Sequence, residues 1–598
     1  MTDQFTLFDD LNQEMDEVDR SRRTFVTGAG IAIATAGLGL PTTGLLAKDT
    51  AARFQVPVLR GRRFNLDIKE APVNFTGKAR VATTINGTVP APVLRWKEGQ
   101  RVTLDVHNSM AHSSSIHWHG IILPARMDGV PGISFKGIAP GKTYHYEFDV
   151  KQNGTYWYHS HSAFQEQTGM YGAIIIDPIK PPPYRYDREY VVQLSDWSDE
   201  NPTTIYHKLK KLSHYYNFNE RTLADLQKDI KRYGVKKTWA QRKMWNRMRM
   251  SQRDLSDVTG YTYTFLTNGL TPDQNWTGLF KRGEKVLLRF INSSAMSFFD
   301  VRIPGLKMTV VASDGQYIKP VSIDEFRIAV AETYDVIVEP HDDRAYTIFA
   351  QSLDRTGYAR GTLTPSLGLQ ASVPAVDLVP NLTHTDMGMN MSGGKHSMHG
   401  MHSGHSAKTM DHSKHQMNGR AGYGSDKPVT HVKTEYGPHV DMRAEKPQVR
   451  LDDPGIGLRN NGRKVLTYRM LRNFYKTPDP REPGREIQLH LTGNMMRYMW
   501  SVNGIKYADA EPIRLKYGER VRFTLINDTM MNHPMHLHGV WSDLETGDPR
   551  HIPRKHTVIV QPGAKISYLV TADAMGGWAY HCHLIYHMLG MFRKVEIS

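Results

Sequence analysis

Residues 283–292 read Gly-Glu-Lys-Val-Leu-Leu-Arg-Phe-Ile-Asn and follow an Asn268-Gly269 pair. The same arrangement occurs at two other places in the chain: Asn86-Gly87 before residues 99–108, and Asn503-Gly504 before residues 518–527. In each copy the first glycine and the last asparagine are nine residues apart, with apolar side chains between them. An Asn-Gly turn followed by such a run is typical of a strand that follows a tight turn. Three copies predict three related β units, and many short strands with Gly and Pro turns indicate sandwiches or barrels.

Four histidine motifs lie outside the middle unit, and one of them contains the only cysteine of the 598 residues. The motifs are His117-Trp118-His119-Gly120, His159-Ser160-His161, His533-Pro534-Met535-His536-Leu537-His538-Gly539, and His581-Cys582-His583 with His587. Residues two apart on a strand share a face, so each histidine pair can point at one metal cluster while Cys582 points the other way. A thiolate with imidazoles and a weak thioether is the ligand set of a blue-copper site. Structural zinc prefers several cysteines or one compact ligand group, so the pattern favours copper.

The middle unit lacks these ligands at the comparable strand. The three aligned stretches are Tyr156-Trp157-Tyr158-His159, Tyr346-Thr347-Ile348-Phe349-Ala350 and Trp578-Ala579-Tyr580-His581. Only the first and third end in a histidine. We therefore expect the middle unit to be a spacer that brings the outer two together around one shared cluster.

The four motifs, in this order and in the first and last units, resemble those of the multicopper oxidases. Other stretches resemble the copper-resistance protein A branch of that family: Asp453-Pro454-Gly455-Ile456-Gly457-Leu458, residues 491–500, and Lys243-Met244-Trp245 with Met248-Arg249-Met250. The resemblance implies an all-β chain of three cupredoxin-like Greek-key barrels. We place the first barrel at residues 53–180, the second at 181–372 and the third at 446–598.

The resemblance also implies four copper ions and a role for each motif residue. One type 1 copper would be bound by His533, Cys582 and His587, and one type 2 copper by His117 and His536. A type 3 copper pair would take the remaining six histidines: His119, His159, His161, His538, His581 and His583. Because His581 and His583 flank Cys582, an electron accepted at the type 1 copper has a bonded path to the cluster that reduces O2 to water.

An acid is expected near this cluster. Asp128 lies nine residues after His119 and matches a residue that family members use for proton delivery. The alternative is a surface turn, because Asp-Gly, here Asp128-Gly129, is a common turn pair.

The sequence offers three candidates for the axial ligand of the type 1 copper. Relatives usually have three residues between the second type 1 histidine and the Gly-Met pair, whereas two separate His587 from Gly590-Met591 here. Either the loop tightens and Met591 supplies the thioether, or Met588 or Phe592 takes that place. We expect Met591.

Residues 384–417 contain seven histidines and seven methionines. Thioethers select Cu(I) and imidazole binds copper in either state, so this tract is expected to collect additional copper. Its other residues are too polar to form a core, which predicts a disordered linker within residues 373–445; the alternative is a linker whose methionines are incidental. The candidate ligands are Met387, Met389, Met391, His396, Met398, His399, Met401, His402, His405, Met410, His412, His415 and Met417.

A second methionine group lies in the third unit. Met495, Met496 and Met499 could form another entry site for Cu(I), or they could be strand residues that face the core.

The N-terminal residues resemble an export signal. Ser21-Arg22-Arg23-Thr24-Phe25-Val26 precedes an uncharged stretch rich in Gly, Ala and Thr, which is typical of the twin-arginine route. We expect residues 1–52 to be this signal and the rest of the chain to be periplasmic; the alternative is an arginine pair before an amphipathic helix. No other apolar run approaches the length of a membrane span, so no stable span is expected.

Positive charge is concentrated in the second unit. The chain carries a net charge of +15, and residues 207–253 hold fourteen lysines and arginines against three acids. Their apolar spacing predicts a solvated helical insertion at about 205–255, and a docking surface for an acidic partner or an anionic membrane is the alternative. Nucleic acid is not an expected partner, because no binding module is recognisable.

Three functions fit these observations. The first is a cuprous oxidase that converts Cu(I) to Cu(II) with O2 and serves copper resistance, together with other periplasmic copper-handling proteins. The second is a laccase-like phenol oxidase. The third is a copper-sequestering protein, against which the complete set of catalytic ligands argues. The methionine content favours the first.

Overall fold

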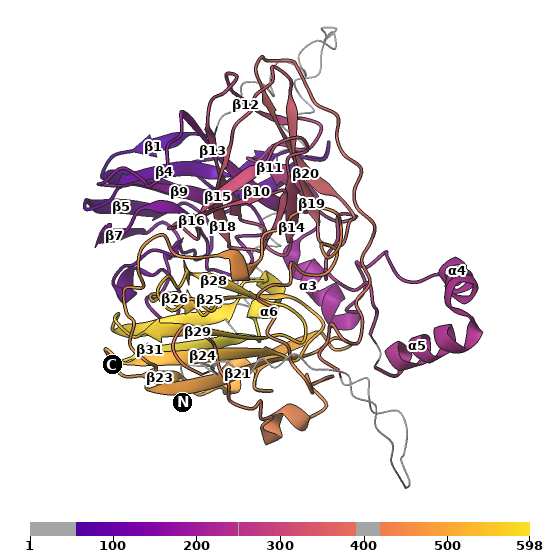
Figure 1. The fold of residues 1–598 in the computed structure, drawn as a ribbon. Helices are drawn as coiled ribbons and strands as arrows, with labels where there is room; N and C mark the ends of the chain where they lie inside the picture. Colours follow the sequence, from indigo (N-terminus) through magenta and orange to yellow (C-terminus); the bar gives the residue numbers. More distant parts are fainter. Residues whose placement is uncertain (1–55, 249, 390–418) are drawn as a thin grey trace.

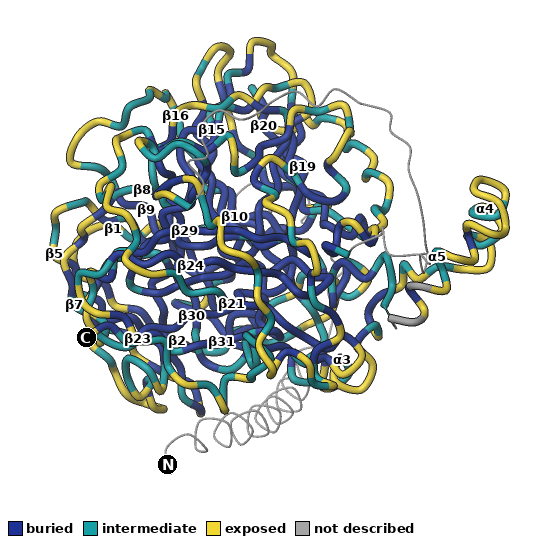
Figure 2. Tube along the Cα trace, turned by 60° about the horizontal axis from the view of Figure 1, so that its bottom comes forward, coloured by how far each residue is buried: buried dark blue, intermediate teal, exposed yellow. Residues whose placement is uncertain are grey.

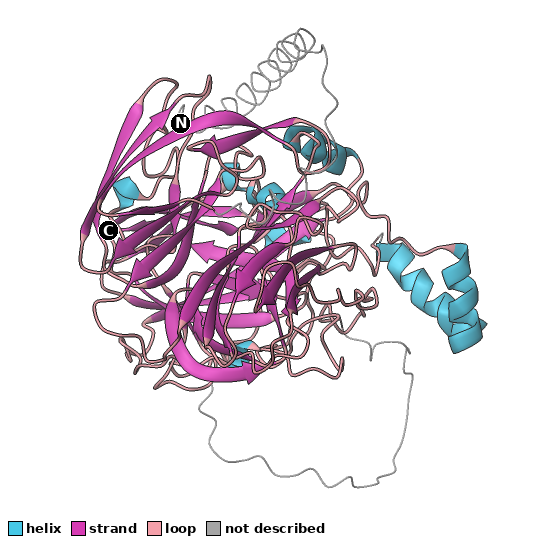
Figure 3. Cartoon of the chain, turned by 90° about the horizontal axis from the view of Figure 1, so that it is seen from above, coloured by secondary structure: helices cyan, strands magenta, loops and turns pink. Residues whose placement is uncertain are grey.

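The computed structural model describes residues 56–248, 250–389 and 419–598. Within these residues six β-sheets form three units, and the few helices lie at their edges (Figures 1 and 3). The prediction of an all-β chain with three cupredoxin-like barrels is confirmed. The expected signal, residues 1–52, lies outside the described residues, as does the tract from 390 to 418.

The first unit pairs a five-stranded sheet with a four-stranded one. In sheet order the first consists of β1 (Val58–Arg60), β4 (Ala91–Lys97), β9 (Tyr171–Asp177), β8 (Gly154–His159) and β6 (His117–His119). The second consists of β3 (Arg80–Ile85), β2 (Arg63–Val73), β5 (Arg101–Asn108) and β7 (Thr143–Asp149). Two histidine motifs thus lie on or directly after neighbouring strands, β6 and β8.

The second unit has a six-stranded and a five-stranded sheet. The six strands are β11 (Thr264–Thr267), β10 (Arg188–Trp197), β13 (Val286–Asn292), β18 (Thr333–Val338), β15 (Met308–Ser313) and β16 (Gln316–Ile323). The five are β12 (Trp276–Leu279), β20 (Tyr358–Thr364), β19 (Tyr346–Ser352), β14 (Phe299–Arg302) and β17 (Glu325–Ile328).

The third unit repeats that plan. Its first sheet contains β22 (Met499–Val502), β21 (Arg485–Asn494), β24 (Arg520–Asn527), β29 (Lys565–Thr571), β26 (Ser542–Leu544) and β27 (Arg554–Lys555). Its second contains β23 (Ile513–Leu515), β31 (Phe592–Ile597), β30 (Gly576–Cys582), β25 (His533–Leu537) and β28 (Thr557–Val560). The other two histidine motifs lie on or beside the adjacent strands β25 and β30.

The repeated Asn-Gly pair forms the same turn in each unit. Asn86, Asn268 and Asn503 all have positive φ angles, as do the glycines that follow, which is the backbone of a type I′ hairpin turn. Their side-chain oxygens accept backbone N–H bonds of 2.7–2.8 Å from Asp67, Gln193 and His490 respectively. The turn is therefore anchored to the neighbouring strand in all three units.

The later asparagine of each repeat links separate segments of its unit by hydrogen bonds. Asn108, Asn292 and Asn527 are fully buried, and each side-chain amide donates to two backbone carbonyls from separate loops or strands. A buried amide must find such partners, which explains why this residue ends the run in every copy. The strands that precede it differ in burial: β5 is buried on one face, whereas β13 and β24 are buried throughout.

The basic insertion is helical, as predicted. It contains α3 (Pro202–Lys211), α4 (Leu223–Tyr233) and α5 (Val235–Met248). Asn201 caps α3, and Thr222 with Asp225 forms a capping box on α4. Helix α3 packs Ile205 and Leu209 into the core, while α4 and α5 form a largely exposed hairpin that projects from the body (Figures 1 and 2).

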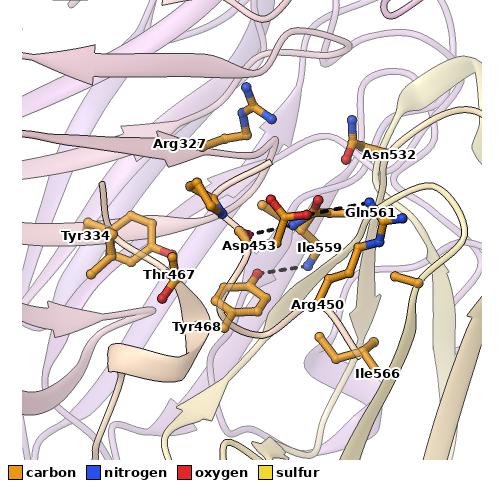
Figure 4. A pocket seen from close by; sticks show the side chains of 13 residues that line it. Arg327, Tyr334, Arg450, Asp453, Thr467, Tyr468, Asn532, Ile559, Gln561 and Ile566 are labelled. Atoms are coloured by element: carbon orange, nitrogen blue, oxygen red, sulfur yellow. Dashed lines mark hydrogen bonds and ion pairs between the residues drawn. The ribbon is translucent and has the colours of Figure 1, made fainter. Parts of the chain in front are cut away.

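The segment that leads into the third unit lies between it and the second. Gln561 donates to the carbonyl of Asp453, and the Ile559 N–H donates to the Tyr468 hydroxyl, around a cavity of about 50 Å³ (Figure 4). Arg327 of the second unit donates to the Ile456 carbonyl. The stretch 453–458 noted in the sequence is thus an interface segment.

None of the helices within the described residues combines the length and the apolarity that crossing a membrane would need.

Candidate metal centre

Three side chains of the third unit converge on one buried point. His533 begins β25, Cys582 ends β30, and His587 lies in the one-turn helix α6 (Ile585–Met588). Cys582 Sγ is 3.5 Å from His533 Nδ1 and 3.9 Å from His587 Nδ1, and these two nitrogens are 3.3 Å apart. One thiol and two imidazoles therefore face a common centre, as the motifs predicted.

The outer nitrogen of each imidazole has a partner that fixes the ring. Thr529 Oγ1 lies 2.7 Å from His533 Nε2, and His587 Nε2 donates to Asp257 Oδ2 at 2.6 Å. Trp500 stacks on His587 with the ring centroids 3.8 Å apart. Such contacts leave Nδ1 of both rings free to bind a metal.

Asp257 could not be identified as a site residue from its sequence position. It follows the basic insertion of the second unit, and its carboxylate also accepts a bond of 2.9 Å from the Tyr498 hydroxyl. The middle unit is therefore more than the spacer that we expected. It supplies no residue to the described histidine clusters of the outer units, but it supplies the carboxylate that holds His587.

The loop after His587 tightens, and it places Met591 beside Cys582. Met591 N–H donates to the His587 carbonyl at 2.9 Å, and Cys582 N–H donates to the Met591 carbonyl at 3.0 Å. Phe592 pairs with His581 across β30 and β31, and the two rings stack. Because neighbouring strand residues face opposite sides, Met591 lies on the Cys582 face and Phe592 on the other.

Gly590 makes this tight loop possible. A Cβ at this position would lie 2.0 Å from the carbonyl oxygen of Trp500, the residue that stacks on His587. Met588, the other alternative, is half-buried between two apolar clusters.

The eight histidines of the four pairs converge between the first and third units. They form three groups whose ligand atoms lie within 4.8 Å of one another: His117, His119 and His536; His119, His159 and His583; and His161, His538 and His581. The nitrogen pairs that join the two units are 3.4 Å apart for His117 and His536 and 3.4 Å for His161 and His581. Each unit supplies four of the eight rings, so neither unit holds the cluster alone.

Several of these nitrogens are buried and have no hydrogen-bond partner within residues 56–248, 250–389 and 419–598. Both ring nitrogens of His119 and His583, and Nε2 of His159, are in this state. Burial, with the neighbouring imidazoles, lowers the pKa of these three rings well below the usual value, so they are neutral. Buried neutral imidazoles with unpartnered nitrogens are the donor set that a copper cluster requires.

Asp128 lies against this cluster. Its carboxylate accepts a bond of 2.8 Å from His538 Nδ1, and its carbonyl accepts one of 2.8 Å from His117 Nδ1. The side chain is 1% exposed, so the surface-turn alternative is wrong. Gly129 permits the approach, because a Cβ there would lie 1.8 Å from the Ile116 carbonyl oxygen.

A second acid at the cluster was not expected from the sequence. Glu166 Oε2 lies 2.7 Å from His159 Nδ1 in a fully buried position. Desolvation, followed by the nearby Asp196, raises the pKa of Glu166 well above its usual value. Its position seven residues after His159 carries no recognisable spacing signal.

Burial also raises the pKa of the Cys582 thiol, with a minor contribution from Asp257. A bound copper ion reverses this effect, since a coordinated thiol is deprotonated.

The additional methionine sites are only partly described. Met495 is buried and Met496 is exposed in the turn between β21 and β22, and Met499, half-buried, begins β22. Residues 384–389 pack against the protein rather than forming a free linker, because the His384 ring contacts Trp245 of α5, with the centroids 4.9 Å apart, and Met387 is buried. Met389 is half-buried. The other candidates, from Met391 to Met417, lie outside the described residues.

Known proteins share both the sequence and the fold. Three family models described as multicopper oxidase match residues 67–181, 188–366 and 480–598. Copper resistance protein A of Escherichia coli is 57% identical, with 97% of this chain and 99% of that protein covered. Copper resistance protein A of Pseudomonas syringae pv. tomato is 54% identical over the same shares. The crystal structure of Fet3p, a multicopper oxidase that functions in iron import, has the same fold, with a TM-score of 0.60 at 21% identity over 90% of this chain and 91% of that one.

Proposed function

Because this chain belongs to the multicopper oxidase family, we propose that it oxidises Cu(I) to Cu(II) with O2 as electron acceptor and serves copper resistance. The similarity to two copper resistance proteins supports the second part. The observation that carries the first part is the path from a methionine-rich turn through Tyr498 and Asp257 to His587.

The copper ligands are assigned from the convergent groups. His533, Cys582 and His587 would hold the type 1 copper, with Met591 as the thioether beside them, and His117 and His536 would hold the type 2 copper. Two groups of three would hold the type 3 pair: His119, His159 and His583, and His161, His538 and His581. Copper in these sites would accept electrons one at a time and pass them to O2, four for each molecule reduced to water.

The protein supplies the electron path and the protons. Cys582 is covalently continuous with His581 and His583, which belong to different groups of the cluster. Asp128, bonded to His538, is the proton-delivering acid on the first unit's side. Its carboxylate accepts the His538 Nδ1–H bond, so Asp128 would fix that ring and place an acid beside the cluster.

The donor side fits a small soft cation better than a phenol. His587 is fully buried, so an aromatic substrate has no direct contact with the ring. Lys210 of α3 donates to the carbonyl of Tyr498, so the basic insertion covers this side. The turn below it carries Met495, Met496 and Met499, whose thioethers select Cu(I).

The location and the linker complete the proposal. We assign residues 1–52 to a twin-arginine signal and the working enzyme to the periplasm, where other copper-handling proteins would exchange copper with it. The histidines and methionines of the 384–417 tract would collect copper for the turn at Met496. This assignment rests on the sequence motifs.

The test is O2 uptake by the copper-loaded protein with Cu(I) and then with a phenol as donor. We expect Cu(I) to be much the faster donor, and a Met496→Leu/Met499→Leu double variant to raise KM for Cu(I) about tenfold with little change in kcat, because uniform binding is removed. The phenol rate of this variant is the internal control. Faster turnover of the phenol would favour the laccase-like function, and no uptake at full copper occupancy would favour sequestration.

A further inference from the structure

A second cluster of metal-ligating side chains lies outside the centres described above. His431 and Glu435 come from the segment before the third unit, where η3 (Lys433–Tyr436) is a short 3-10 helix. His490 lies on β21, and Asp528 follows β24. One ligand atom from each of the four lies within 4.8 Å of the others.

The four atoms alternate around a ring. His431 Nδ1 is 2.8 Å from Glu435 Oε2, which is 3.5 Å from His490 Nδ1. His490 Nδ1 is 2.7 Å from Asp528 Oδ2, which is 3.6 Å from His431 Nδ1. Nitrogen therefore alternates with oxygen, and the like atoms stand on the diagonals.

Within the described residues, the two acids of this ring pair only with its two histidines. The Glu435 and Asp528 side chains have no exposed surface, and no described lysine or arginine makes an ion pair with either. Elsewhere the chain pairs such acids with a lysine: the buried Lys555 Nζ lies 3.0 Å from both Asp314 and Glu332. Two further atoms in the ring residues, Glu435 Oε1 and His490 Nε2, are buried and have no hydrogen-bond partner among the described residues.

We propose that His431, Glu435, His490 and Asp528 form a binding site for a divalent transition-metal cation, with Cu(II) bound most tightly. Two imidazoles and two carboxylates can bind one divalent cation, whose charge the two carboxylates would balance. Mixed imidazole nitrogen and carboxylate oxygen donors suit Cu(II), and the general affinity order of divalent metals places Cu(II) highest. The ligand set lacks the sulfur that Cu(I) prefers.

The site is held in place by the strands around it. Asp528 N–H donates to the Leu491 carbonyl, and Asp528 Oδ1 accepts from the Ala444 N–H at 2.6 Å. The backbone of His490 is fixed by Asn503, the asparagine of the repeated turn. His431 is the most exposed ligand, at 15%, and so lies at the entrance.

The site is joined to the type 1 centre but does not depend on its activity. Asp528 is followed by Thr529, whose hydroxyl lies against His533. The loop between β24 and β25 thus carries Asp528, a ligand of this site, and Thr529, which contacts the type 1 ligand His533. The inference rests on the four side chains alone, so it can fail while the oxidase function stands.

The experiment is a Cu(II) titration of the full-length holoenzyme in the presence of a competing chelator, with a Glu435→Gln variant. Blue absorption of the type 1 copper serves as the check that the variant is folded. We expect the variant to bind about one Cu(II) fewer, with affinity at the lost site reduced by more than the ~10–100-fold typical of supporting residues. The 384–417 tract is identical in both proteins, so its copper cancels in the difference.

His439→Gln is the matched control, because His439 lies in the same segment and bonds only to the Thr434 carbonyl. Equal Cu(II) binding by wild type and Glu435→Gln, or a loss shared by His439→Gln, would overturn the proposal. Tighter binding of Zn(II) than of Cu(II) would overturn the copper preference. Should Glu435→Gln fail to fold, crystals of the unsubstituted chain soaked in Cu(II) decide: an anomalous peak between the four side chains supports the site, and its absence overturns it.

Discussion

The two catalytic copper centres differ in how many units build them. The proposed type 1 ligands come from one unit, on β25, β30 and α6, whereas the eight-histidine cluster takes four rings from each of two units. The first is shaped by the packing of a single barrel. The second exists only where two barrels meet, so its stability is linked to the docking of the units and to metal binding.

The difference also explains the surroundings of each centre. The type 1 rings are fixed by Thr529, Trp500 and Asp257, and the last comes from the middle unit. The cluster rings are fixed by Asp128 and Glu166, both from the first unit. Each centre therefore receives at least one carboxylate from a unit other than the third, although the third supplies ligands to both.

We expect the largest effect from Cys582→Ser, which tests whether the eight-histidine cluster forms independently of the type 1 site. Loss of the thiolate should remove the blue absorption and lower Cu(I)-dependent O2 uptake by at least about 1,000-fold, or ~4 kcal/mol. The eight histidines are unchanged, so about three of the four catalytic coppers should remain. Copper content, absorption and O2 uptake measure this together. Loss of all four coppers would show that the cluster cannot form without the type 1 site.

The second test measures how the stability of the metal-free protein depends on pH. Burial lowers the pKa of His581 to about 4 and those of His119, His159, His161, His536, His538 and His583 well below the usual value. The unfolded chain binds more protons below its histidine pKa of about 6.5, so stability is full above that pH and falls as the pH drops.

Each such histidine lowers the free energy of unfolding by up to about 1.4 kcal/mol for each pH unit below 6.5. Urea melts of the metal-free chain at pH 7.5 and 5.5 should therefore show a fall in the free energy of unfolding. Most of it should come from the seven cluster histidines named above, with a smaller part from His533 of the type 1 centre. A flat dependence would mean that the metal-free cluster is already open to water.

The third test affects the cluster alone. Asp128→Asn keeps the shape of the side chain but removes the charge that receives the His538 proton. Turnover should fall by about 10–100-fold while the blue absorption stays unchanged. The exposed Asp509→Asn is the control. A variant with altered absorption would show that the two centres are coupled through more than Cys582.

Much of this arrangement could be predicted from the sequence, because residues two apart on a strand lie on the same face. The Asn-Gly turns and the buried asparagines such as Asn527 recur in all three units, and the histidine pairs follow directly from strand alternation. The partners of those histidines could not be predicted. Asp257 reaches His587 because the second unit docks on the third, and Glu166 reaches His159 from a buried loop. Neither contact produces a recognisable residue spacing in the sequence.

The smallest expected effect concerns the axial ligand, the one feature of the type 1 site for which the sequence left three choices. Strand alternation places Met591 on the face of Cys582, so Met591→Leu should raise the type 1 reduction potential and change turnover only a few-fold. The substitution conserves volume and should cost less than about 1.5 kcal/mol of stability. Met588→Leu is the matched control and should leave the potential unchanged. Because both variants lose one thioether from the same loop, a shift of the potential in Met588→Leu alone would move the axial assignment to Met588.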